Sequence, residues 1–191
     1  MPCPRFLALL ALTALVAAPA WSQTERIGSQ TRVLFTSTDT IKDNDGVYRQ
    51  ITTTLTYEPV RGAYVQTVTD ASGALLSSDE RSVSVAAPTP AEAAAAVQLV
   101  ADHPEIATLT AGASGPVTIE GGFPLVREEG HPCGPGGRCA LYDVWETVDG
   151  SLERIRFVIV DLRNVRVLDA DADPQADTNL ANPAARRQSR L

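Results

Sequence analysis

The chain has few of the side chains that usually carry out chemistry. Its 191 residues include two histidines, three cysteines, one methionine and one lysine, and aromatic residues make up 5%. It contains neither a Gly-x-Ser-x-Gly nucleophile motif nor a glycine-rich phosphate loop that ends in lysine. The sequence therefore excludes the serine hydrolases and nucleotide-binding proteins that depend on these two motifs.

Positive charge is also scarce, with 16 basic against 23 acidic residues and a formal net charge of −7. No run of lysine or arginine occurs before the C-terminal tail. Nucleic acids and anionic membrane surfaces attract proteins that present a basic face. We therefore expect no nucleic-acid partner and no binding to anionic membranes.

The N-terminus has the three parts of a secretory signal peptide. Arg5 precedes an apolar run from Phe6 to Ala18, and small residues follow up to Ser22. This run is shorter than the roughly 20 residues of a membrane-spanning helix, and no later segment approaches that length. We predict a signal peptide at 1–22, with cleavage after Ala20 or Ser22, no membrane span, and a periplasmic or secreted mature protein.

Two cysteines remain after the predicted cleavage, because Cys3 lies inside the signal peptide. Cys133 and Cys139 flank a loop that is rich in glycine and proline, in a compartment that favours oxidation. We predict that they form a disulfide that closes this loop. Arg138, beside Cys139, is the residue that we expect at the tip of the loop, where it could contact a partner.

The first half of the mature chain has the pattern of an antiparallel β-meander. Two Thr-rich and Val-rich segments, 30–39 and 47–57, flank a turn at 43–46 that ends in Asp-Gly. Two further strands, 63–69 and 74–85, flank a second turn at 70–73. The alternation of apolar and polar residues in these segments predicts one buried and one wet face.

A helix signal follows the meander. Thr89 is a suitable N-cap, Pro90 suits the first helical position, and Glu92 completes a capping box. The helix is expected to run to Ala101 and to break near Pro104, before a short second helical piece at 105–109. Strands are then expected at 117–120, 123–127, 140–148, 152–160 and 165–168.

These elements predict an α+β fold in which a curved antiparallel sheet packs on one main helix. We expect residues 23–169 to form a single domain, with a β-meander part (23–86) and a helix-plus-sheet part (87–169). The meander could continue that sheet or form a small sheet of its own. Residues 170–191 contain few apolar side chains and are expected to be a disordered tail.

The order of short strings in the later part is similar to that of a known family. Thr-Asp-Ala-Ser-Gly ends a strand, Thr-Pro-Ala-Glu starts a helix, Asp-His-Pro-Glu-Ile follows it, and Val-Asp-Leu closes a late strand. This order, across residues 64–169, resembles the small cystatin-like N-terminal domains of copper amine oxidases. The resemblance implies a non-catalytic α+β domain, because the chemistry of that family resides in a separate large domain.

Alternative chemistry finds little support in the residues. A zinc site at His131, Cys133 and Cys139 would need a distant fourth ligand. The acidic string that starts at Asp169 has Pro174 where a calcium loop requires glycine. His103 precedes a proline at a helix end, where a terminating role is expected. We predict no catalytic, cofactor-binding or metal-ligating residue.

Three hypotheses for function remain open from the sequence. The first is a non-catalytic extracytoplasmic module that binds a protein or an envelope component. The second is an inhibitor or chaperone-like partner of a secreted enzyme, which would bind through loop 131–139. The third is an enzyme of unrecognised type, which would need a pocket with convergent ionisable groups.

Overall fold

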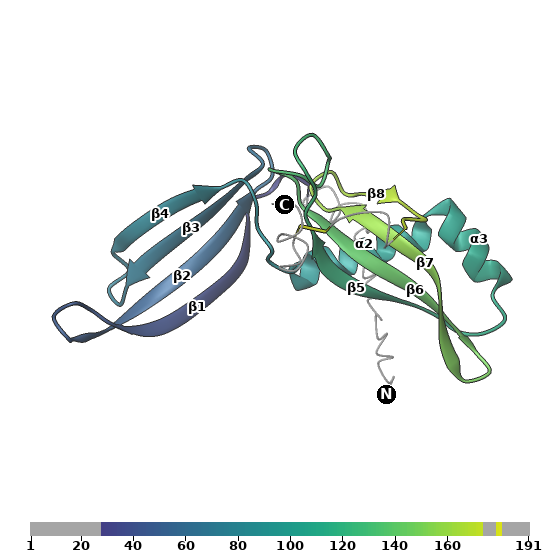
Figure 1. Cartoon of the computed structure of the whole chain (residues 1–191), viewed down its shortest axis with the longest axis horizontal. Helices are drawn as coiled ribbons and strands as arrows, with labels where there is room; N and C mark the ends of the chain where they lie inside the picture. The colour runs from purple at the N-terminus through teal and green to yellow at the C-terminus, as the bar shows by residue number, and fades with distance from the viewer. Residues whose placement is uncertain (1–27, 174–178, 181–191) are drawn as a thin grey trace, which may run out of the picture.

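The computed structural model describes residues 28–173 and 179–180. The predicted signal peptide (1–22) lies outside the described residues, as do positions 174–178 and 181–191 of the predicted tail. Two antiparallel four-stranded sheets lie end to end along the long axis of the molecule (Figure 1). The broad α+β expectation is confirmed, since two helices accompany these sheets.

The first sheet is the predicted meander. Its strands are β1 (Arg32–Lys42), β2 (Tyr48–Glu58), β3 (Ala63–Asp70) and β4 (Leu75–Arg81), hydrogen-bonded in chain order. The predicted turn between β1 and β2 forms because the Asp43 carboxylate accepts hydrogen bonds from the backbone N–H groups of Asp45 and Val47, each at 3.0 Å. Gly46 supplies the positive φ, 80°, that this turn requires.

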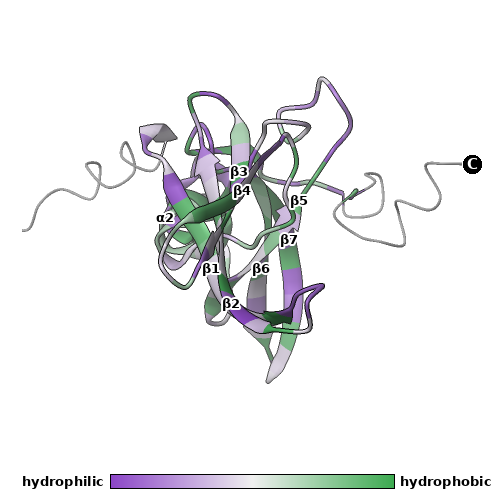
Figure 2. Ribbon diagram, turned by 90° about the vertical axis from the view of Figure 1, so that its left-hand side faces the viewer, coloured by the Kyte–Doolittle hydropathy of each residue, from purple (hydrophilic) through white to green (hydrophobic). Residues whose placement is uncertain are grey.

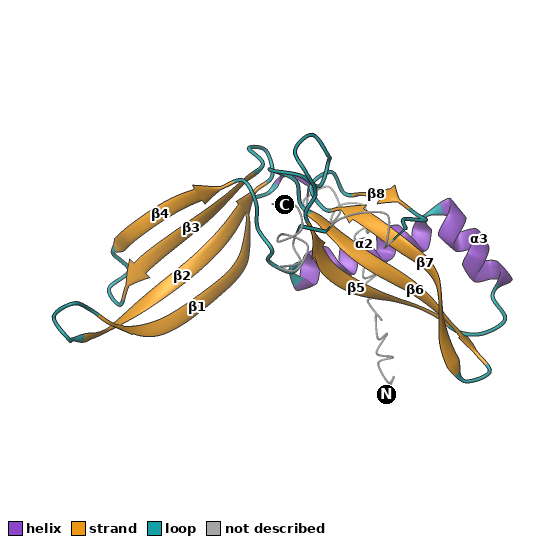
Figure 3. Ribbon diagram, in the orientation of Figure 1, coloured by secondary structure: helices purple, strands orange, loops and turns teal. Residues whose placement is uncertain are grey.

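The second sheet follows the helices. Its strands are β5 (Val117–Leu125), β6 (Cys139–Val148), β7 (Ser151–Asp161) and β8 (Arg166–Asp169), again in chain order. Helices α2 (Pro90–Asp102) and α3 (Pro104–Gly112) accompany this sheet and not the first one (Figure 3). Apolar residues of α2 and α3 pack on β6 and β7; the buried members of this core are Ala96, Val100, Ile106, Ala140, Tyr142, Val144, Val158, Val160 and Leu162.

The helix start has the predicted capping box. Thr89 is the N-cap, its side chain accepts from the Glu92 N–H, and the Glu92 side chain accepts from the Thr89 N–H at 2.8 Å. The helix ends at Asp102, and α3 begins at the proline that was expected to break it. None of the described helices has the length and apolarity needed to cross a membrane.

Two expectations need correction in the second sheet and the tail. The predicted strands 117–120 and 123–127 are one strand, β5, because Gly121 and Gly122 form a bulge at positive φ instead of a turn.

The predicted tail does not begin at residue 170. Ala170 and Ala172 are buried, and the Ala172 N–H donates to the Phe157 carbonyl at 2.8 Å, since methyl side chains are small enough to pack there.

Candidate functional site

The place where the two sheets meet holds a buried ion pair between distant segments. Glu92, at the start of α2, has no exposed side-chain surface. Arg138, just before β6, donates from Nε to one carboxylate oxygen and from Nη2 to the other, each at 2.7 Å. The same guanidinium donates to the backbone carbonyls of Ala86 and Ala87, at 3.3 and 3.0 Å. Arg138 therefore ties β6, α2 and the segment after β4 together.

This geometry corrects the expectation for Arg138. We expected it at the exposed tip of the disulfide loop, but it is 4% exposed. An arginine this deeply buried requires a charged or hydrogen-bonding partner, and Glu92 and the two carbonyls supply both. Arg138 therefore has no free surface for a partner protein, and its role lies inside the chain. Nothing in the spacing of residues 92 and 138 indicated the pair.

A second arginine reaches the same carboxylate from the first sheet. Arg32 of β1 places Nη1 3.1 Å from Glu92 Oε1, as an ion pair without hydrogen-bond geometry. Its guanidinium lies 5.2 Å from the centre of the Tyr57 ring, and that of Arg138 lies 5.8 Å from the same centre. The Tyr57 ring therefore lies close to both arginines.

Burial and charge act in opposite directions on these groups. Burial alone would raise the pKa of Glu92, but hydrogen bonds and charge from Arg138, with help from Thr89 and Arg32, hold this pKa below its ordinary value. Burial would lower the pKa of Arg138, yet Glu92 keeps it above its ordinary value. Burial lowers the pKa of Arg32. Glu92 and Arg138 therefore stabilise the charged form of each other.

The disulfide loop joins the two sheets through its backbone. Cys133 and Cys139 are bonded, as predicted, and both are buried. The Tyr57 hydroxyl donates to the Gly136 carbonyl at 3.0 Å, and the Tyr64 hydroxyl donates to the Gly137 carbonyl at 2.7 Å. The Gly136 N–H donates to the Ser82 carbonyl at 2.6 Å. The loop that we expected to be available to a partner is therefore largely engaged within the chain.

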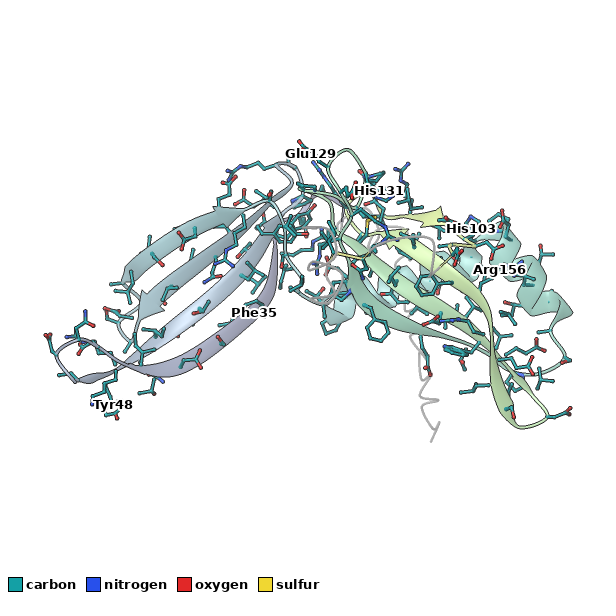
Figure 4. All side chains as sticks on the ribbon, viewed as in Figure 1. Phe35, Tyr48, His103, Glu129, His131 and Arg156 are labelled. Carbon is teal, nitrogen blue, oxygen red and sulfur yellow. A yellow bond between two sulfur atoms is a disulfide. The ribbon has the colours of Figure 1, made fainter. Side chains whose placement is uncertain are left out.

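The two histidines lie apart in the fold (Figure 4). His103 is the residue between α2 and α3, and His131 accepts a hydrogen bond on Nδ1 from the Cys133 N–H at 3.0 Å. Within residues 28–173 and 179–180, no three His, Cys, Asp or Glu side chains come together as metal ligands would.

Exposed apolar side chains are concentrated in the first sheet and its connections. Of the twelve large hydrophobic residues exposed among the described positions, ten lie between 33 and 85: Val33, Phe35, Ile41, Val47, Tyr48, Val60, Leu75, Leu76, Val83 and Val85. Figure 2 views the molecule from this end, where hydrophobic stretches appear on the strands nearest the viewer. Tyr48, at the β1–β2 hairpin, is 69% exposed and extends away from the sheet (Figure 4).

One face of the first sheet is covered with hydroxyl groups. The pairing of the strands places nine threonine and serine side chains on this face, which we call the threonine face: Thr36, Thr38, Thr40, Thr52, Thr54, Thr56, Thr67, Thr69 and Ser78. The hydroxyls of Thr36 and Thr54 lie 3.4 Å apart, and those of Thr38 and Thr52 lie 3.3 Å apart. None of the nine is buried, so this face is available for contact.

Compared with known proteins, the chain matches no family model and no curated sequence. The resemblance to the N-terminal domains of copper amine oxidases thus stays a prediction that rests on the order of a few short strings.

Proposed function

We propose that this protein is a non-catalytic extracytoplasmic module that binds a protein or envelope component through its first sheet. The observation that carries the proposal is the concentration of exposed apolar side chains on β1, β4 and the connections of that sheet. Large exposed apolar areas on a folded chain mark interaction surfaces. The second sheet, by contrast, covers one face with α2 and α3 (Figure 1).

The buried junction supports a binding role for the first sheet. Arg32, Tyr57 and Tyr64 fix one end of that sheet to Glu92 and to the disulfide loop. An anchored sheet loses less conformational freedom on binding than a loosely attached one. Its far end, which includes Tyr48 and Leu75, is left exposed, and an aromatic anchor there is typical of residues that dominate interfaces.

Two features support a location outside the cytoplasm. The first 22 residues have the order of a secretory signal peptide. The disulfide between Cys133 and Cys139 is of a kind that persists in oxidising compartments. The resemblance to amine oxidase N-terminal domains belongs to the same proposal, because those domains are also non-catalytic.

The inhibitor hypothesis assigned contact to loop 131–139, and the structure favours the first sheet over that loop. Cys133, Arg138 and Cys139 are buried, and the carbonyls of Gly136 and Gly137 accept hydrogen bonds from Tyr57 and Tyr64. The exposed residues of this loop are His131, Pro132 and Pro135, which form a smaller surface than the first sheet offers. We therefore keep the binding surface on the first sheet.

The test is a comparison of three baits in pull-downs from envelope and secreted fractions of the native organism. The baits are the wild type, the double variant Tyr48→Ala/Leu76→Ala in the first sheet, and Leu152→Ala in the second. Leu152 is the matched control, because it is 61% exposed on β7. The proposal requires a partner that the wild type and Leu152→Ala capture and the double variant loses. A partner lost only with Leu152→Ala, or captured equally by all three, would overturn it.

A further inference from the structure

β1 is an edge strand that is only partly protected against pairing, since its regular part contains two charged residues, Asp39 and Lys42. It is eleven residues long, and one of its sides pairs with β2 while the other has no strand beside it among the described residues. The only irregularity in its pairing with β2 is a shift of register between Val33 and Phe35. Residues 35–42 therefore pair regularly with β2, and none of them is proline. Folded proteins usually block such edges with charges, proline or bulges, because an open edge pairs readily with another chain.

The peptide groups available at this edge can be assigned. The close hydroxyl contacts of Thr36 with Thr54 and of Thr38 with Thr52 are typical of non-hydrogen-bonded pairs, whose side chains lie closest together. In such pairs the peptide groups of the β1 residue point away from β2. The N–H and C=O groups of Thr36, Thr38 and, by alternation, Thr40 therefore point to the open edge.

The side chains of β1 complement a second antiparallel copy of β1 in one register. With Thr38 opposite Thr38, Phe35 lies opposite Ile41, Thr36 opposite Thr40 and Ser37 opposite Asp39. Lys42 falls opposite Leu34, which lies at the irregularity and packs against the core of the first sheet, so this pair is outside the match. Phe35 and Ile41, which are 44% and 43% exposed, would cover each other twice across the pair. Thr–Thr neighbours of the kind already seen between β1 and β2 would recur, and no two like charges would oppose each other.

Other pairings lack this match. With Ser37 opposite Ser37, Phe35 would lie opposite Asp39. The other edge strand, β4, is no better: with Ser78 on the axis, Leu75 would lie opposite Arg81 and Leu76 opposite Glu80. An apolar side chain opposite a charge loses the contact that stabilises a cross-strand pair. Side-chain complementarity therefore selects β1 and selects one register.

We propose that two copies of this chain pair antiparallel along β1, about a two-fold axis at Thr38, to form one continuous eight-stranded sheet. The contact uses the same patch on both copies, so it closes at two chains and does not continue into a fibre. The threonine faces of the two copies join across the axis. This inference is independent of the identity of any partner.

The first experiment measures the mass of the purified chain in solution by sedimentation across a range of concentrations. The wild type is expected to be a dimer at high concentration. Phe35→Lys and Ile41→Asp should each raise the dimer dissociation constant about tenfold or more, because each removes two apolar pairs from the dimer. Leu75→Lys, on the β4 edge, is the matched control and should leave the dimer unchanged. Circular dichroism of each variant checks that it remains folded.

A mixture of the two variants tests the register itself. When a Phe35→Lys chain meets an Ile41→Asp chain, the new lysine lies opposite the new aspartate, and the remaining phenylalanine lies opposite the remaining isoleucine. The equimolar mixture should therefore form dimers that neither variant forms alone. A monomeric wild type, or a mixture no more dimeric than its components, would overturn the proposal.

A cross-link provides a readout that does not depend on weakening the dimer. Two Thr38 Cα atoms in a hydrogen-bonded pair would lie about 5.5 Å apart, a separation that a disulfide spans. Thr38→Cys should therefore form a covalent dimer under oxidising conditions. Ser78→Cys on β4 should stay monomeric, and a covalent dimer of Ser78→Cys in place of Thr38→Cys would contradict the assignment.

Discussion

The Glu92 carboxylate caps helix α2 and, at the same time, accepts two hydrogen bonds of 2.7 Å from Arg138, 46 residues further along the chain. The Glu92 side chain thus serves two purposes. It caps the start of α2, and it holds Arg138, which links the second sheet to the segment after β4. Removing it affects both.

Glu92→Gln should be strongly destabilising. The amide keeps an oxygen for the Thr89 N–H but leaves the charges of Arg138 and Arg32 without a counterion. Breaking a buried ion pair on one side typically costs about 3–5 kcal/mol of unfolding free energy. Urea denaturation measures this loss. Glu105→Gln, at an exposed position in the first turn of α3, is the control and should change stability little.

The same pair predicts how stability depends on pH. The native pKa of Glu92 lies below its ordinary value of 4.5, so the unfolded chain binds this proton more readily than the folded chain. The contribution of Glu92 is therefore complete above pH 4.5 and decreases as the pH falls through the lower native pKa. The unfolding free energy of the Glu92→Gln variant should fall less steeply over this acidic range. An equally steep fall would show that other carboxylates control acid unfolding.

Replacing both cysteines tests the role of the disulfide at the junction. Cys133→Ala/Cys139→Ala removes a cross-link that closes a short loop, and the chain-entropy model gives a loss of about 2 kcal/mol. The loop also presents the carbonyls that accept from Tyr57 and Tyr64, so its release should loosen the anchored end of the first sheet. Thermal unfolding and limited proteolysis between residues 82 and 88 measure the two effects. An unchanged cleavage rate there would contradict this role.

Two tyrosines offer a matched comparison of buried hydroxyls. The Tyr142 hydroxyl is buried and has no hydrogen-bond partner among the described residues, and burial raises its pKa to about 12. Tyr142→Phe should therefore leave the unfolding free energy unchanged or raise it by up to about 1 kcal/mol. Tyr64→Phe removes the 2.7 Å bond to Gly137 and should lower it by about 1 kcal/mol. Equal losses in the two variants would mean that Tyr142 also has a partner.

The C-terminal segment protects part of the β5 edge. The Asn179 side chain accepts from the Val126 N–H at 3.1 Å and donates to the Pro124 carbonyl at 3.0 Å, while the Leu180 N–H donates to the Val126 carbonyl at 2.9 Å. Asn179→Ala should speed hydrogen exchange at the Val126 amide, because the side-chain acceptor is lost. The amide of Val160, in the interior of the second sheet, should exchange at its original rate.

Local signals predicted local structure well. The Asp-Gly turn, the capping box at Thr89 and Glu92, the break before Pro104 and the disulfide each depend on residues only a few positions apart, and the structure contains them all. These features depend on backbone geometry and on contacts between near neighbours in the chain. Such contacts can be predicted from the residue types in a short stretch of sequence.

Contacts between segments that lie far apart in the chain could not be predicted from the sequence. The sequence predicts separate strands at 117–120 and 123–127, with Gly121 and Gly122 between them. In an antiparallel pair two glycines suit a bulge as well as a turn, and only the neighbouring strand decides between them. The burial of Arg138 depends on Glu92 and on the carbonyls of Ala86 and Ala87, which lie about fifty residues away. Nor could the pattern decide between one sheet and two, because sheet continuity depends on which edges meet in space.

The junction also constrains the order of folding during synthesis. The first sheet precedes α2 and the disulfide loop in the chain, so it is synthesised first. Its hairpins can close early because their contacts are local. Tyr57, Tyr64 and Arg32, however, have no acceptor or counterion until Glu92 and residues 136–137 arrive. The first sheet, which is synthesised first, therefore gains these contacts only when α2 and the disulfide loop have followed it. Until then its tyrosines are exposed to chaperones and proteases.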